Sequence, residues 1–197
     1  FARGKSKHRP RNDPQLFKNG KYPLVQTGEV KGANLFINKH SATYNDLGLN
    51  QSKLWPQGTL CITIAANIAE TALLGYPMCF PDSIVGFLAD KQESSELFMH
   101  YVFTYIRRAI QNSTSGSIQD NINIDYLTGL KFKIPIKSYQ DKIVDENSLK
   151  QQNQYRARSH GQAHLRLLVC TIRLPRRQRQ TLQIIGRQNG LQRCAKA

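Results

Sequence analysis

Apolar runs separated by short turn segments recur through the first ninety residues. The run at residues 59–64 is rich in β-branched side chains and follows the turn signal Trp55-Pro56-Gln57-Gly58, which is typical of a buried strand. Residues 3–11 alternate basic side chains with Gly, Ser, His and Pro, so we expect a loop there. The run pattern predicts further strands at residues 22–26, 35–37, 71–74, 84–88 and 130–134.

One segment has the period of a helix. Between Ser94 and Ile110 the apolar side chains recur at helical spacing and fall on one face. Ser94 or Ser95 can cap the start of this helix, and residues 138–146 resemble the first turns of a second one. Strands, one long amphipathic helix and a last strand predict an α+β fold with a mixed sheet, followed by a helical stub and an irregular tail.

Charge is distributed unevenly along the chain. The 197 residues carry 28 Lys and Arg against 13 Asp and Glu, a net charge of +15. Residues 147–197 hold eleven of the basic residues and no acidic residue, so the first 146 residues are only mildly basic. A basic chain favours a nucleic-acid partner. No apolar run is long enough for a membrane span, and four cysteines without ligand spacing predict a cytoplasmic protein without a metal site.

Three segments in order resemble the specificity subunits of type I restriction-modification systems. Residues 116–140 are similar to the end of a target-recognition domain, and residues 2–30 and 58–87 are similar to its opening and its central sheet. The resemblance implies a target-recognition domain at 1–137 and the start of a conserved spacer helix at 138–146. The positions that carry the first similarity are Gly116, Gln119, Asn121, Asn123, Leu127, residues 130–135 and Gln140.

The tail at 147–197 departs from the family pattern, which continues with a helix containing a motif like LNNRINTELEAMA. Codons can be chosen for residues 147–162 that, read one nucleotide later, give IRLNNRINTELEAMA, and the agreement continues from Ala163. We therefore expect an out-of-frame basic tail, with sequencing of the gene around the codon for Glu146 as its test. The alternative is an evolved basic arm that binds DNA.

The resemblance also implies a function. The chain would bind double-stranded DNA as a half-site reader and would direct methylation and cleavage by partner methyltransferase and restriction subunits. It would need no catalytic residue or cofactor of its own. Because the tail replaces the spacer helix, docking of the methyltransferase subunit is expected to be impaired. The alternatives are a non-functional truncated product and a non-specific basic nucleic-acid-binding protein.

Two sets of residues suit DNA binding, since basic side chains neutralise phosphates while amides and hydroxyls read base edges. Residues 1–40 contain nine basic side chains against two acidic ones. For the basic residues the alternative interpretation is a solvated loop, and for the amide and hydroxyl residues it is ordinary turn capping. The phosphate candidates are Arg3, Lys5, Lys7, Arg9, Arg11, Lys18 and Lys21. The base-reading candidates are Gln26, Thr27, Ser117 and Gln119.

An enzymatic function finds little support in the sequence. The five histidines show no spacing that pairs them with a nucleophile. Glu70 and Asp82 are a conceivable pair of nuclease carboxylates, but no Glu-x-Lys dyad accompanies them. No phosphate-binding glycine loop or methyltransferase Asn-Pro-Pro-Tyr motif is present either.

Overall fold

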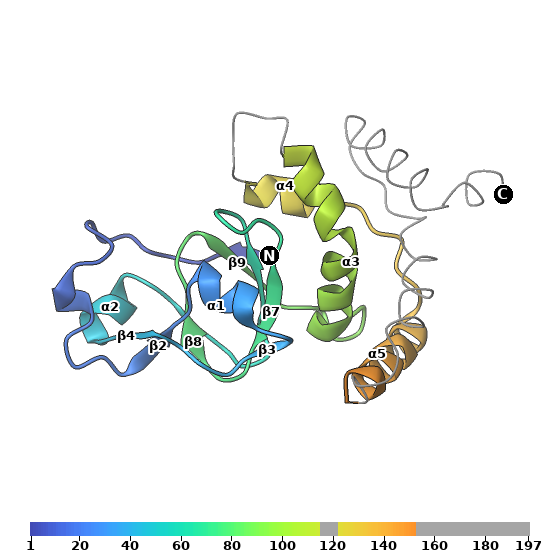
Figure 1. The fold of residues 1–197 in the computed structure, drawn as a ribbon, viewed down its shortest axis with the longest axis horizontal. Helices are drawn as coiled ribbons and strands as arrows, with labels where there is room; N and C mark the ends of the chain where they lie inside the picture. Colours follow the sequence, from blue (N-terminus) through green and yellow to red (C-terminus); the bar gives the residue numbers. More distant parts are fainter. Residues whose placement is uncertain (115–121, 153–197) are drawn as a thin grey trace.

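The computed structural model describes residues 1–114 and 122–152. Ser117, Gln119 and the tail beyond Gln152 lie outside this range, so the expectations for them stay predictions. A strand-rich part carries the N-terminus, and two long helices, α3 and α5, follow one another away from it (Figure 1). The observed elements confirm the predicted α+β class with a mixed sheet and one long amphipathic helix.

The larger sheet has five strands in the order β1-β9-β6-β7-β3. Strand β6 is antiparallel to both β7 and β9, with Cys61 opposite Ala72 and Gly86, whereas the edge strand β3 is parallel to β7. All residues of β6 and β7 are buried, as expected for strands covered on both faces. The strands are β1 (Ala2–Arg3), β3 (Phe36–Ile37), β6 (Leu60–Thr63), β7 (Thr71–Leu74) and β9 (Ile84–Phe87).

Alternate residues of these strands face two different cores, because successive side chains of a strand point to opposite faces. Leu60 and Ile62 pack with α3 in one cluster, whereas Cys61 packs with Trp55 and Phe80 in the other. Cys61 and Cys79 are buried free thiols, which confirms the prediction of reduced core cysteines for these two.

The smaller sheet has four strands in the order β4-β2-β8-β5. Strand β2 is antiparallel to β4 and parallel to β8. Leu16, Leu24, Tyr44 and Cys79 form a small core here. The elements of this part are the 3-10 helix η1 (Pro14–Leu16), β2 (Tyr22–Leu24), β4 (Ala42–Tyr44), α2 (Asp46–Asn50), β5 (Leu54–Trp55) and β8 (Met78–Cys79).

The predicted long helix is confirmed as α3 (Glu96–Thr114). Ser95 caps it, since its Oγ accepts a hydrogen bond from the Phe98 amide at 3.1 Å. Ser94 has a different role. Its Oγ donates to Oε1 of the fully buried Gln140 at 2.9 Å, and Gln140 Nε2 donates to the carbonyls of Glu93 and Pro135. Gln140 therefore fixes the start of α5 (Lys137–Gln152) against the start of α3.

Two predicted strands need correction. The strand expected at 22–26 ends at Leu24, and Gln26 instead precedes helix α1 (Thr27–Gly32). The strand expected at 130–134 is wrong, because only Lys131 forms an isolated bridge, after the unpredicted helix α4 (Ile124–Gly129). Leu130 and Phe132 pack against the α3 core instead of pairing in a sheet, so their alternation with lysines reflects packing. The stub predicted at 138–146 is helical and continues to Gln152.

Candidate nucleic-acid interface

The basic arm, residues 3–11, is anchored to the larger sheet at its start. Arg3 pairs with Val85 in the β1–β9 ladder, and the Gly4 amide donates to the Ile84 carbonyl at 2.9 Å. Beyond the strand, burial alternates: Gly4 and Ser6 are buried, whereas Lys5 and Lys7 are exposed. The expectation of a loop therefore holds for most of the arm, but its first residue, Arg3, belongs to strand β1, and its side chains have a defined inner and outer face.

Gly4 lies against the core so closely that another side chain does not fit. A Cβ at this position would lie 2.6 Å from both the Phe80 carbonyl oxygen and its ring Cδ2. The Phe80 ring in turn stacks on Trp55, with 4.8 Å between the ring centroids. Packing between the two sheets thus sets the path of the arm.

The arm's three arginines bind groups of the protein. Arg3 Nε donates to the Asp82 carbonyl at 2.5 Å, and Arg11 Nη2 forms an ion pair with Asp82 Oδ2 at 2.7 Å. Arg9 Nη1 donates to the carbonyls of Ser6 and His8 at 2.7 and 2.8 Å. These three residues were predicted to contact phosphates, but in the described structure each of them stabilises the arm itself.

The lysines are placed differently. The side chains of Lys5, Lys7 and Lys18 are exposed and form no hydrogen bond or ion pair within residues 1–114 and 122–152. Lys21 Nζ lies 3.7 Å from Asp46 Oδ2, but both side chains are more than two-thirds exposed, so this pair holds Lys21 weakly. The four lysines remain accessible to an anion.

A histidine links the arm to the neighbouring loop. The His8 amide donates to Gln51 Oε1 at 3.2 Å, and His8 Nε2 lies 2.7 Å from Asp13 Oδ2. The pKa of Asp13 is lowered, first by the hydrogen bond from the Gln15 amide and then by His8. Asp13 is thus a carboxylate that neutralises part of the charge at the far end of the arm.

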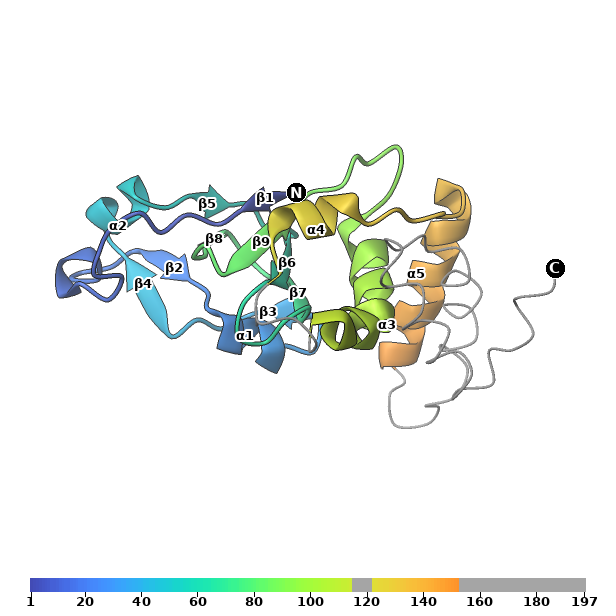
Figure 2. The same cartoon turned by 90° about the horizontal axis from the view of Figure 1, so that it is seen from above.

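Gln26 and Thr27 stand at the start of α1 and not at the end of a strand. The Gln26 amide donates to Glu29 Oε2 at 2.8 Å, while the Gln26 side chain is exposed. Figure 2 shows β1 along one edge of the strand-rich part and α1 along the opposite edge. The structure therefore does not bring these two residues together with the start of the arm.

Lys53 belongs to the candidate interface and was not predicted from the sequence. It is exposed, it follows Gln51 by two residues, and its Nζ lies 4.0 Å from the centroid of the Trp55 ring. Lys53 directly precedes β5, and its basic side chain two residues before Trp55 was the available signal. Lys53 adds a cation beside the loop that holds His8.

The two carboxylates considered for nuclease chemistry both bind arginines. Glu70 forms an ion pair with Arg107, and Asp82 with Arg11. Within the described residues, no group of three or more His, Cys, Asp or Glu side chains is arranged to hold a metal ion. No helix in this part of the chain is long and apolar enough to cross a membrane.

A model of the type I restriction modification DNA specificity domain matches residues 2–146. The chain belongs to this family. The fold of this specificity domain also resembles the crystal structure of the HsdS subunit from Thermoanaerobacter tengcongensis, with a TM-score of 0.52 and 15% identity over 82% of this chain and 38% of that chain. The domain thus spans less than half of that subunit.

A second solved structure is described as the structural basis of complex assembly and conformational transition of the type I R-M system. It matches with a TM-score of 0.45 and 16% identity over 70% of this chain and 32% of that chain. A comparison with curated proteins finds no match.

Proposed function

We propose that this specificity domain binds one half-site of double-stranded DNA and performs no catalysis itself. The family match over residues 2–146 carries the proposal. The exposed lysines of the arm support it, because cations that bind no protein group are available to phosphates. Methylation and cleavage would be performed by partner methyltransferase and restriction subunits in the cytoplasm.

The candidate residues then divide into three roles. Lys5, Lys7, Lys18, Lys21 and Lys53 contact phosphates. Arg3, Arg9 and Arg11 hold the arm and contribute to the positive potential around it. Base edges are read by amide and hydroxyl side chains, for which the candidates remain Gln26, Thr27, Ser117 and Gln119.

The tail is proposed to result from a change of reading frame after Glu146. The end of the family match at residue 146 supports this boundary. Helix α5 continues to Gln152, and the Asn147 side chain donates to the Ile143 carbonyl at 2.8 Å, so the first substituted residues are compatible with a helix. Gene codons around Glu146 that do not yield the shifted motif would falsify this proposal.

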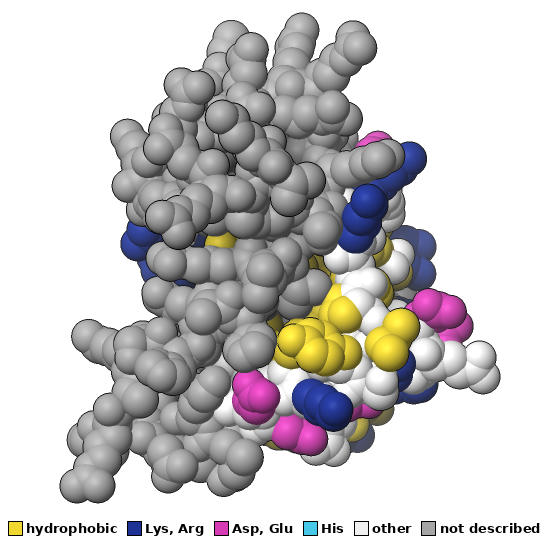
Figure 3. All heavy atoms as spheres, turned by 90° about the vertical axis from the view of Figure 1, so that its right-hand side faces the viewer, with side chains coloured by type: hydrophobic (Ala, Val, Ile, Leu, Met, Phe, Trp, Pro, Cys, Tyr) yellow, Lys and Arg dark blue, Asp and Glu magenta, His cyan; other side chains and the backbone are white. Residues whose placement is uncertain are grey.

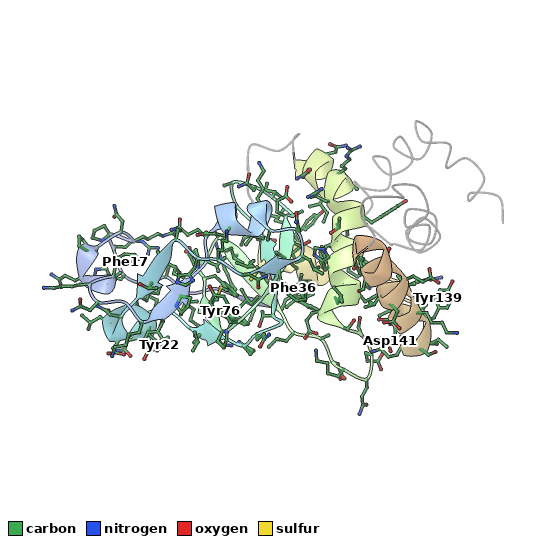
Figure 4. All side chains as sticks on the ribbon, turned by 60° about the horizontal axis from the view of Figure 1, so that its bottom comes forward. Phe17, Tyr22, Phe36, Tyr76, Tyr139 and Asp141 are labelled. Carbon is green, nitrogen blue, oxygen red and sulfur yellow. The ribbon has the colours of Figure 1, made fainter. Side chains whose placement is uncertain are left out.

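The end of the molecule that carries α5 is the proposed contact with partner subunits. Figure 3 views this end and shows apolar side chains gathered between acidic and basic ones. Exposed apolar residues in this part are Ile134, Ile136 and Tyr139, with Ile136 exposed to 75%. Figure 4 places Tyr139 and Asp141 on α5, at the opposite end from Phe17 and Tyr22. A tail that replaces the rest of the spacer helix would impair docking here.

Lysine substitutions in the arm test the DNA-binding proposal. Lys5→Gln and Lys7→Gln are compared with Lys142→Gln, which removes the same charge from an exposed position on α5. Binding to a random-sequence duplex is measured over a salt series. Each arm substitution is expected to lower the slope of log K against log salt by about 0.9, since one phosphate fewer is neutralised, and Lys142→Gln leaves it unchanged. Equal effects of all three substitutions would contradict the assignment.

A further inference from the structure

We propose that Asp82 is a positioning residue for DNA binding, which holds the arm so that Lys5 and Lys7 face the phosphates. The inference rests on the proposed function and assigns a role to an acidic residue beside a surface that binds an anion. Removal of a negative charge beside a DNA-binding surface would ordinarily strengthen DNA binding, but removal of the Asp82 charge should weaken it.

Asp82 contacts the arm near both of its ends. Its carbonyl accepts from Arg3 and its carboxylate from Arg11, so the segment that contains Lys5 and Lys7 lies between the two contacts. The Asp82 side chain is 23% exposed and that of Arg11 is 51% exposed. The hydrogen bond between Arg11 and this partly buried carboxylate is charge-assisted, and it is stronger than an ion pair between two fully exposed side chains. Asp82 Oδ1 is buried and has no hydrogen-bond partner within the described residues, so Arg11 alone orients the carboxylate there.

The segment between the two contacts is fixed as well. Gly4 packs on Phe80, the His8 amide binds Gln51, and Arg9 binds the Ser6 carbonyl. Lys5 and Lys7 project from the opposite, exposed side. Residues i and i+2 of an extended chain lie roughly 6.6 Å apart, a spacing similar to that of consecutive phosphates in one DNA strand. The arm thus presents two cations in a row before DNA binds.

Charge and position act in opposite directions at Asp82. Its charge repels phosphates, but this repulsion is screened over about 8 Å at physiological salt. The alignment of Lys5 and Lys7 depends on the arm's path, and a loose arm must be ordered at the moment of binding, which lowers affinity. The Asp82 carboxylate holds Arg11 at the far end of the arm, whereas Arg3 is held by the main-chain carbonyl, so we infer that loss of the carboxylate releases this far end and that the positional effect exceeds the charge effect.

The test compares Asp82→Ala with Glu93→Ala in the full chain. Both substitutions remove one negative charge, and Glu93 is exposed and lies away from the arm, just before α3. Affinity for a random-sequence duplex is measured over a salt series. Asp82→Ala is expected to bind roughly tenfold more weakly, with a slope reduced by about 0.9 for each phosphate that the arm no longer neutralises. Glu93→Ala is expected to bind as the wild type or slightly more tightly.

A second variant, Arg11→Gln, removes the same contact from the side of the arm, and hydrogen exchange of this single variant tests the inference even if Asp82→Ala fails to fold. Arg11→Gln alone should weaken binding, but in the Asp82→Ala background its further effect should be smaller, because both residues act through one contact and only the contribution of Arg11 to the positive potential remains to be lost. Hydrogen exchange at the Gly4 and His8 amides should accelerate in both single variants.

The possible outcomes distinguish the proposed DNA-binding function from the positioning role of Asp82. A wild-type chain that binds no duplex overturns the proposed function and this inference with it. A wild-type chain that binds, together with an Asp82→Ala variant that binds equally or more tightly, overturns the positioning role alone. Additive effects of Arg11→Gln and Asp82→Ala overturn it too, since they would make Arg11 a direct phosphate contact.

Discussion

His100 is a titratable side chain that faces the sheet from the second turn of α3. Only 5% of it is exposed, and its Nδ1 lies 3.1 Å from Thr71 Oγ1. Burial, and to a lesser extent the charge of Arg107, lowers the pKa of His100 to about 4. The folded protein therefore keeps this histidine neutral at pH values where an unfolded chain protonates it.

This difference predicts a pH dependence of stability. An unfolded histidine has a pKa of about 6.5, so the unfolded state binds the extra proton as pH falls from there towards 4, and the folded state loses stability in that window. The loss from His100 is on the order of 3 kcal/mol. Urea unfolding between pH 7 and pH 4 measures it, with His100→Gln as the comparison. Identical pH profiles for the two proteins would show that His100 does not contribute.

The structural role of Gly4 cannot be predicted from its neighbours in the sequence. A glycine among basic residues indicates a loop, but here it is required by the Phe80 carbonyl and ring, which lie 76 positions further along the chain. The same holds for Asp82, whose two contacts with the arm no local pattern indicates. Charge and exposure of the lysines were predictable, whereas the engagement of Arg3 and Arg11 by Asp82 depends on long-range geometry.

Gly4→Ala is predicted to displace the arm. The new Cβ would overlap with Phe80, and overpacking of this kind costs about 1–3 kcal/mol. Gly28→Ala is the matched control, because nothing lies within 4 Å of a Cβ at that position in α1. Thermal unfolding should show a lower Tm for Gly4→Ala and an equal or higher Tm for Gly28→Ala. A Gly4→Ala variant as stable as the wild type would mean that the arm is not packed as described.

At the scale of elements, local patterns predicted those elements whose core contacts repeat along one segment. Helix α3 and strands β6, β7 and β9 carry their own apolar pattern, and the sequence indicates them well. Strands β1, β5 and β8 have two residues each and exist because distant partners pair with them, so no local signal marks them. The alternation at residues 130–134 had a different cause, namely packing against α3.

The junction of α3 and α5 gives a prediction at this scale. Gln140→Ala would leave the Glu93 and Pro135 carbonyls and the Ser94 hydroxyl without a partner, which costs roughly 1–3 kcal/mol. Lys142→Ala, on the exposed side of the same helix, should change stability by less than about 0.5 kcal/mol. Urea unfolding compares the two. If Gln140→Ala were as stable as Lys142→Ala, the junction would not depend on this side chain.

At the scale of the whole molecule, the net charge of +15 describes two different parts. The specificity domain within residues 1–146 is mildly basic, and its excess lies in residues 1–40, where the arm is located, because residues 41–146 have more acidic than basic side chains. Residues 147–197 carry the remaining eleven positive charges and lie beyond the family match. The family was evident from ordered motifs in the sequence, while the bases that a half-site reader would recognise depend on side-chain placement in a groove.

The central claim is that the folded domain selects a DNA sequence, and that the tail does not. Selection from a random-duplex library across a salt series tests it, with the full chain and a chain ending at Gln152 in parallel. The tail's cations should add affinity that is independent of sequence and falls steeply with salt. We expect both chains to enrich the same motif, and we expect the shorter chain to go on enriching this motif as the salt concentration of the series rises. Binding that disappears with the tail and enriches no motif would contradict the account.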